Sequence, residues 1–122
     1  MAKTILIVDD SASMRQVVSI ALKGAGYDVI EACDGKDALS KMTGIKIHLI
    51  VSDINMPVMD GITFVKEVKQ NASYKFTPII MLTTEMEPDK KQAAKDAGAK
   101  AWVTKPFQPP VLLGAIAKLV LP

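Results

Sequence analysis

Three aspartates lie at the ends of two apolar runs, and their placement predicts a shared site. Asp9 and Asp10 directly follow the run ILIV at 5–8, and Asp53 follows the run LIV at 49–51 and one serine. Continuous apolar runs of this length are typical of strands buried on both faces. Open parallel sheets place their chemistry beyond the carboxyl ends of the strands, so we expect the three carboxylates to converge.

Carboxylates gathered in a partly buried site favour a divalent cation. Three like charges held within a few ångströms repel one another, and a metal ion is their natural counterion. An all-oxygen ligand set points to Mg²⁺, which keeps several waters and also binds phosphate oxygens. Zinc is disfavoured because the chain has one histidine and one cysteine.

A hydroxyl and a cation are expected at the same edge of the sheet. Thr83 ends the fourth apolar segment and Lys105 follows the fifth. A metal, a hydroxyl and an ammonium group around a carboxylate are typical of phosphoryl transfer, where positioning and charge neutralisation do most of the work. Asp53 can then act as a nucleophile and become an aspartyl phosphate.

Five strand-like segments alternate with five segments of helical spacing. The predicted strands cover 4–8, 28–32, 47–52, 78–82 and 101–104; the predicted helices run from Ser11 or Ser13 to Gly24, around 38–42, from Gly61, over 89–97 and from Pro109 to about Val120. This (βα)5 pattern predicts an α/β fold, a doubly wound parallel five-stranded sheet with helices on both faces. The common order for five strands, 2-1-3-4-5, reverses between the two strands that end in aspartate.

The motifs together resemble the receiver domain of bacterial two-component response regulators, and most of all the stand-alone chemotaxis regulators of CheY type. The resemblance covers nearly the whole chain: ILIVDD at 5–10, DINMPVMDG at 53–61, Thr83 and KPF at 105–107. It implies a flavodoxin-like, CheY-like fold and one receiver domain over residues 1–122. It also implies a phosphoacceptor that catalyses only its own phosphorylation and dephosphorylation.

The resemblance also implies ligands and a phosphate donor. Asp53 is expected to accept phosphate from a sensor histidine kinase of CheA-like type. Asp10, Asp53 and the backbone carbonyl of Asn55 are expected to ligate Mg²⁺, and Asp9 to contribute through water.

Further residues receive switching roles from the same resemblance. Thr83 and Lys105 are expected to engage the phosphoryl oxygens, and the bond between Lys105 and Pro106 is expected to be cis. Asn55 and Glu85 flank the line along which water attacks the phosphate, which predicts a short-lived signal. The expected class is therefore a phosphorylation-activated switch that regulates flagellar motor rotation in chemotaxis.

The expected contact face combines the lysine-rich helix 89–97, the final helix and Trp102. Its target would be a FliM-like flagellar motor switch protein or another protein, and a phosphatase is a possible further partner. Trp102 stands where related receivers have a tyrosine or phenylalanine that changes rotamer. The larger indole leaves two readings open, a rotamer switch and a half-buried structural tryptophan.

Three alternatives share parts of this pattern. A phosphorelay intermediate would pass phosphate on to a histidine phosphotransfer protein. A phosphohydrolase with an aspartate nucleophile normally has a DxD pair, whereas Asp53 is followed by Ile54 and Asn55. A flavin mononucleotide binder shares the fold, but Asp9 and Asp10 would repel the flavin phosphate.

Composition excludes several other classes. The 122 residues are 49% hydrophobic and carry a net charge of +2 without a long run of like charges, so no nucleic-acid or membrane partner is expected. No apolar run is long enough for a membrane span or a signal peptide, which predicts a soluble cytoplasmic protein. Cys33, the one cysteine, is expected as a small buried hydrophobe, and His48 as a structural residue without an obvious partner.

Overall fold

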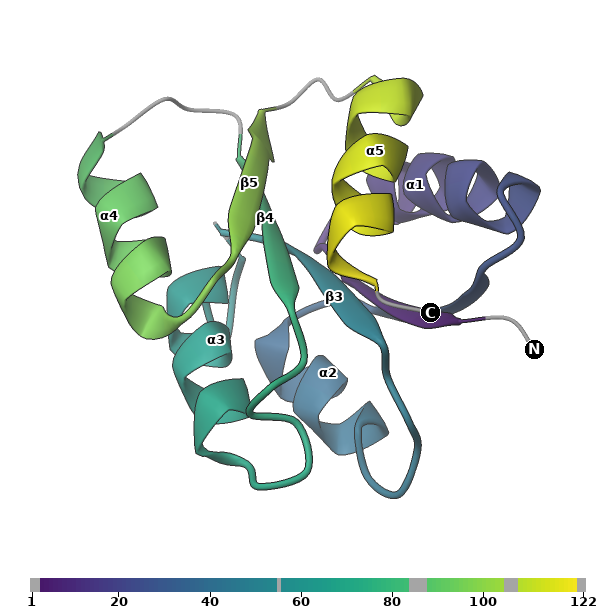
Figure 1. Ribbon diagram of the computed structural model, residues 1–122. Helices are drawn as coiled ribbons and strands as arrows, with labels where there is room; N and C mark the ends of the chain where they lie inside the picture. The colour runs from purple at the N-terminus through teal and green to yellow at the C-terminus, as the bar shows by residue number, and fades with distance from the viewer. Residues whose placement is uncertain (1–2, 55, 84–87, 105–107, 121–122) are drawn as a thin grey trace.

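The described residues, 3–54, 56–83, 88–104 and 108–120, form one parallel sheet of five strands with five helices around it (Figure 1). In this computed structural model, residues 83, 88 and 90 are described by their backbone alone. The strands are β1 (Thr4–Val8), β2 (Asp28–Ala32), β3 (Leu49–Asp53), β4 (Ile79–Thr83) and β5 (Ala101–Thr104). The helices are α1 (Ala12–Gly24), α2 (Gly35–Lys41), α3 (Gly61–Gln70), α4 (Pro88–Ala97) and α5 (Pro109–Leu119). The strand order β2-β1-β3-β4-β5 confirms the prediction.

Both faces of the sheet are buried, which explains why the central strands are continuously apolar. In β1, Ile5 and Ile7 pack with the apolar residues of α1 and α5, whereas Leu6 and Val8 pack with those of α2, α3 and α4. Figure 1 shows the same division, with α1 and α5 on one side and the other helices opposite. A strand with helices on both faces has no side that can be polar.

Short side-chain caps fix where the helices begin beyond the strand ends. Ser11 caps α1, Asp34 caps α2 through the N–H of Asp37, and Asp60 caps α3 through the N–H of Thr63. Each cap satisfies a backbone donor that the first helical turn leaves unpaired. Consequently three helices start close to the carboxyl edge of the sheet, where the predicted site lies.

Two strands differ slightly from their predicted ranges. The strands predicted over 47–52 and 78–82 lie at Leu49–Asp53 and Ile79–Thr83. Pro78 has no N–H to give to the ladder, although its carbonyl oxygen accepts from the N–H of Ile50 at 3.0 Å. Asp53 is the last residue of β3.

Among the described residues, none of the helices is both long and apolar enough to cross a membrane.

Candidate metal centre

The three predicted aspartates converge at the carboxyl edge of the sheet. β1 and β3 are neighbours, with Val8 level with Ser52, so Asp9, Asp10 and Asp53 follow at nearly the same height. One carboxylate oxygen from each lies within 4.8 Å of the other two. Asp9 is 1% exposed and Asp53 is 8% exposed, whereas Asp10 is open to solvent. The cluster is thus half buried and open on one side.

Backbone donors orient the two buried carboxylates. The N–H of Ser11 donates to Asp9 Oδ1 at 2.9 Å, and the N–H of Ile54 donates to Asp53 Oδ1 at 2.8 Å. The hydroxyl of Ser52 donates to the backbone carbonyl of Asp53 at 2.9 Å. These contacts hold the chain around the cluster in one arrangement, so the carboxylates are positioned before a ligand arrives.

The donor chemistry of the cluster fits Mg²⁺. Its three side chains offer oxygen alone, and their mutual repulsion is relieved by a divalent cation. Histidine and cysteine, which zinc prefers, are absent from this cluster. Asp9, Asp10 and Asp53 are the described residues that would hold the ion.

Gly61 ends the DINMPVMDG motif and starts a helix, but the sequence did not predict how tightly it packs. A Cβ atom at this residue would lie 2.1 Å from the carbonyl oxygen of Asp53 and 2.8 Å from the Cα of Ile54. The N–H of Gly61 donates to the carbonyl oxygen of Ile54 at 2.7 Å. The start of α3 can therefore lie against the end of β3 only because residue 61 has no side chain.

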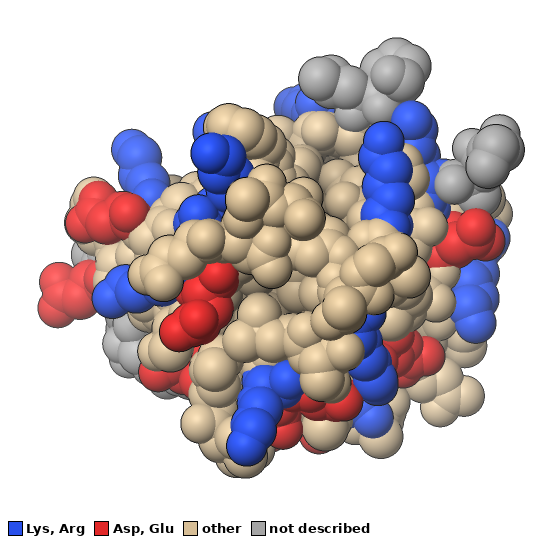
Figure 2. Space-filling view, turned by 90° about the horizontal axis from the view of Figure 1, so that it is seen from below, with Lys and Arg blue, Asp and Glu red and all other residues tan. Residues whose placement is uncertain are grey.

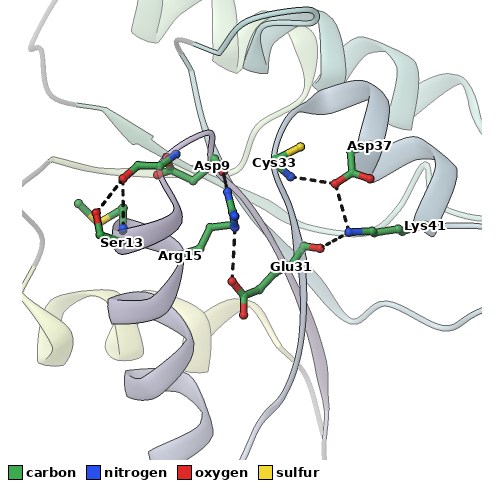
Figure 3. Close-up of polar contacts among 9 residues, drawn as sticks. Asp9, Ser13, Arg15, Glu31, Cys33, Asp37 and Lys41 are labelled. Carbon is green, nitrogen blue, oxygen red and sulfur yellow. Dashed lines mark hydrogen bonds and ion pairs between the residues drawn. The ribbon is translucent and has the colours of Figure 1, made fainter.

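Arg15 is a second residue whose role the sequence analysis missed (Figure 3). Its Nη1 donates to the carbonyl oxygen of Asp9 at 2.6 Å, and its Nε lies 3.4 Å from Glu31 Oε1. The side chain is 19% exposed. Arg15 thus ties α1 to the end of β1 and to β2. The available signal was its place one helical turn after the Ser11 cap, in the helix that follows the acidic pair.

Several predicted site residues fall outside what the structure describes. Asn55, Glu85, Lys105 and Pro106 lie outside the described residues, and so does the side chain of Thr83. The backbone places Thr83 at the last position of β4, level with Thr104 of β5. Its position at the carboxyl edge is as predicted, while the roles of all five residues stay predictions.

Cys33 is not buried, contrary to the prediction. It follows the last residue of β2 and is exposed. Its N–H donates to Asp37 Oδ2 at 3.0 Å (Figure 3). Its Sγ lies 3.7 Å from Asp34 Oδ2. Partial desolvation and these two carboxylates raise the pKa of the thiol. The side chain points to the capped start of α2, so it does not fill the core.

His48 is structural, as predicted, but it does have a partner. The N–H of Thr4 donates to His48 Nδ1 at 2.9 Å, and the N–H of His48 donates to the carbonyl oxygen of Thr4 at 2.8 Å. Desolvation and the nearby ammonium groups of Lys3 and Lys46 lower the pKa of the imidazole. His48 joins the start of β1 to the residue before β3, far from the aspartates.

Trp102 lies on β5 between α4 and α5 and is 36% exposed. The Nζ of Lys91 lies 5.5 Å from the centroid of its indole ring, within the range of a cation–π contact. The indole is therefore a partly exposed residue on the face where a partner contact was expected. Whether it changes rotamer stays a prediction.

Comparison with known families identifies the class of protein. Residues 5–117 match the response regulator receiver domain, and the chain belongs to this family. Receiver domains of this family are signalling switches of two-component systems that accept phosphate.

The chain is similar to proteins with different names and settings. Protein PilG of Pseudomonas aeruginosa is 38% identical over 92% of this chain and 83% of its own length. The structure of chemotaxis protein CheY4 from Vibrio cholerae has a TM-score of 0.94 and 50% identity, and the match covers 98% of this chain and 99% of that one. The receiver domain of sensor histidine kinase PA1611 from Pseudomonas aeruginosa has a TM-score of 0.91 and 25% identity over 98% of both chains. Its structure has a magnesium ion coordinated in the active site cleft.

Proposed function

We propose that this chain is a phosphorylation-activated switch that accepts phosphate on Asp53 from a sensor histidine kinase. The observation that carries the proposal is the convergence of three carboxylates within 4.8 Å of one another at the ends of β1 and β3. Asp53 is the member of this cluster that lies on the central strand and has neighbouring strands on both sides. We also propose that residues 1–122 work as one receiver domain in the cytoplasm.

In this proposal Asp10, Asp53 and the backbone carbonyl of Asn55 hold Mg²⁺, and Asp9 acts through a water molecule. The oxygen-only donor set supports this assignment, as does the magnesium ion in the PA1611 receiver domain. When bound, the ion neutralises negative charge on the carboxylates and on the incoming phosphoryl group.

The chemistry at Asp53 is a phosphoryl transfer between two side chains. A carboxylate oxygen of Asp53 attacks the phosphorus of a phosphohistidine, the P–N bond breaks, and the imidazole leaves as the aspartyl phosphate forms. The hydrogen bond from the Ile54 N–H fixes the rotation of the carboxylate before attack. We assign Thr83 and Lys105 to the phosphoryl oxygens, with a cis bond before Pro106.

The lifetime of the phosphoryl group belongs to the same proposal. Asn55 and Glu85 flank the path of the attacking water, and hydrolysis returns the free carboxylate and inorganic phosphate. We expect a short-lived phosphorylated form, and a lifetime of hours would contradict this assignment. A phosphatase is a possible additional partner.

We propose that the output is read at the face formed by α4, β5 and α5, with a FliM-like flagellar motor switch protein as the target. Trp102 and Val111, both partly exposed, lie on this face, and the CheY4 similarity supports a chemotaxis role. Partner binding should slow amide exchange in α5. Unchanged exchange rates would exclude α5 from the contact.

A phosphorelay intermediate is the second candidate. The similarity to a receiver domain of a sensor histidine kinase favours it, because the same fold also occurs within kinases. Transfer of phosphate from the chain to a histidine phosphotransfer protein would separate this role from motor control.

Mass spectrometry tests the central proposal directly. The chain is incubated with acetyl phosphate and Mg²⁺, and one phosphoryl group is expected on Asp53. The variant Asp53→Asn should gain none, and wild-type protein with a chelator should gain much less. Equal labelling of the variant would show that another residue is the acceptor.

A further inference from the structure

We propose that the amino edge of the sheet, opposite the aspartates, carries a docking site for an acidic partner segment with one aromatic or branched aliphatic residue. We call it the amino-edge hollow and define it by its lining residues, which are Leu39, Met42, 43–48, Asn71, 73–74 and 76–78. This site is independent of the proposed phosphate chemistry, and its experiment fails or succeeds separately.

The hollow is a cavity of about 680 Å³ between two loops. One loop leads from α2 to β3 and the other from α3 to β4. Its apolar lining includes Leu39, Met42, Ile45 and Ile47. A volume of this size, with mostly apolar walls, is typical of sites that take one large side chain or a small ligand.

Hydrogen bonds hold both loops in place, so the hollow exists before a partner binds. The hydroxyl of Tyr74 donates to the carbonyl oxygens of Met42 and of Ile45, the latter at 2.6 Å, and so joins the two loops. The Nζ of Lys69 donates to the carbonyl oxygens of Lys75 at 3.1 Å and Thr77 at 2.8 Å. A preformed site loses less conformational entropy on binding.

Phe76 is the feature of this surface that the fold itself does not explain. Its side chain is 86% exposed, although removing a phenyl ring from water is favourable. It lines the hollow and also an adjoining cavity of about 350 Å³ that reaches Leu119 and Val120. A ring that stands between two apolar cavities can cover an apolar side chain placed in either one.

The charge around the hollow selects an acidic partner. Lys46 lines it, Lys75 places its Nζ 5.1 Å from the Phe76 ring, and Lys100 lines the adjoining cavity. A third cavity shares Ile45, Lys46 and His48 with the hollow and adds Lys3 and Asp28. Lys75 and the lining residues of the three cavities thus include four lysines and one aspartate, which makes this surface positively charged. Figure 2 views the molecule from this side, with lysine side chains projecting around a largely uncharged middle and acidic residues between them.

Topology separates this hollow from the aspartate cluster. His48 and Pro78 each immediately precede a strand, so the hollow lies where the parallel strands begin. The aspartates lie where they end, about 16 Å away over the five residues of β3. An acidic segment bound here does not contact the cluster, so we infer docking that is insensitive to phosphorylation.

The test is a titration of the ¹⁵N-labelled full chain with a capped heptapeptide of aspartate and glutamate around one central phenylalanine. Amide signals of 43–48 and 73–77 should shift saturably. Phe76→Ser and Lys46→Glu should each raise the Kd about tenfold. Both side chains are exposed, so these variants should stay folded. The matched controls Ile20→Ser and Lys36→Glu, on exposed sites of α1 and α2, should leave the Kd within about twofold.

Treatment of the chain with acetyl phosphate and Mg²⁺ should change the peptide Kd by less than about twofold. Mass spectrometry of the same sample measures how much of the chain is phosphorylated. An absence of phosphorylation would reject the proposed function and leave the docking site standing. Three results would overturn the docking site: no shifts at these amides, equal binding of a lysine-substituted peptide, or the same shifts on raising protein concentration without peptide. The last would show that a second copy of the chain occupies the surface.

Discussion

Two glycines test how closely α3 must approach the metal centre. Gly61→Ala places a Cβ 2.1 Å from the carbonyl oxygen of Asp53, and the backbone of β3 cannot move without displacing its carboxylate. We expect a loss of about 3 kcal/mol or more in the free energy of unfolding, together with slower phosphorylation of Asp53. Urea denaturation and acetyl phosphate labelling measure the two effects.

Gly114→Ala is the matched control because its Cβ would meet no atom within 4 Å. Gly114 lies inside α5, where alanine favours the helix over glycine, so stability should rise by about 0.5–1 kcal/mol. If the same glycine-to-alanine change lowers the free energy of unfolding at residue 61 and raises it at residue 114, the loss at residue 61 comes from packing against β3 and not from helix propensity. A similar small effect at both positions would mean that α3 can withdraw from the centre at little cost.

Arg15 gives the second prediction at this scale. Arg15→Ala removes a charge-assisted hydrogen bond to the Asp9 carbonyl oxygen and should lower the free energy of unfolding by about 2 kcal/mol. The pair with Glu31 adds little, because that carboxylate is 40% exposed. Arginine and alanine have similar helix propensities, so the loss would report the contact. The control Gln16→Ala, on the exposed side of α1, should change the free energy of unfolding by less than about 0.5 kcal/mol. An equally small loss for Arg15→Ala would contradict the role of Arg15 in tying α1 to the end of β1.

At the residue scale, the sequence predicts chemistry better than contacts. Asp9, Asp10 and Asp53 could be grouped because each follows an apolar run, and parallel strands bring such positions to one edge. Arg15, Gly61 and Cys33 carry no such pattern. Whether a guanidinium reaches a carbonyl oxygen, or a thiol is exposed, depends on the packing of three elements at once.

At the element scale, His48 links the starts of β1 and β3 in a way that depends on pH. Desolvation and the ammonium groups of Lys3 and Lys46 hold the pKa of the imidazole below its ordinary value of 6.5, and the Nδ1 of the neutral ring accepts from the Thr4 N–H. In the window from pH 6.5 down to the lowered pKa, the unfolded chain binds more protons. Stability from this group is therefore present above pH 6.5 and is lost as the pH falls through that window.

His48→Asn tests this link, because the asparagine Oδ1 can accept the same hydrogen bond without titrating near neutrality. The fall in Tm between pH 7 and pH 5.5 should be smaller for the variant than for wild type. Carboxylates titrate in both proteins and cancel in the difference. Parallel Tm curves would show that His48 does not contribute to the pH dependence.

Element types were predictable because two buried faces require continuous apolar strands, as in β1 and β4. The ends of the strands were less predictable, because the apolar pattern already starts at Ile47 and Pro78, before the first residues of β3 and β4. The final helix shows a second limit. Its apolar sequence predicts that part of it forms a contact face, but only the structure shows that Leu112 and Ile116 face the core while Val111 is 56% exposed. Hydrophobicity alone does not say which side of a short helix faces the sheet.

At the scale of the whole molecule, the fold concentrates negative charge in a chain whose net charge is +2. Three carboxylates within 4.8 Å oppose folding when no cation is bound. Mg²⁺ should therefore raise the free energy of unfolding, by about 1.4 kcal/mol at ten times its Kd. Differential scanning calorimetry against NaCl of equal ionic strength measures this without any phosphate donor.

Asp53→Asn should produce two changes of opposite sense in the same experiment. Without magnesium the variant should be about 1 kcal/mol more stable than wild type, because one of three repelling charges is gone and asparagine can still accept from the Ile54 N–H. With magnesium it should gain much less than wild type, whereas Glu67→Gln, on the exposed side of α3, should keep the full gain. A full gain in Asp53→Asn would place the metal elsewhere. The convergence of three mutually repelling carboxylates at the ends of β1 and β3 would then need another explanation.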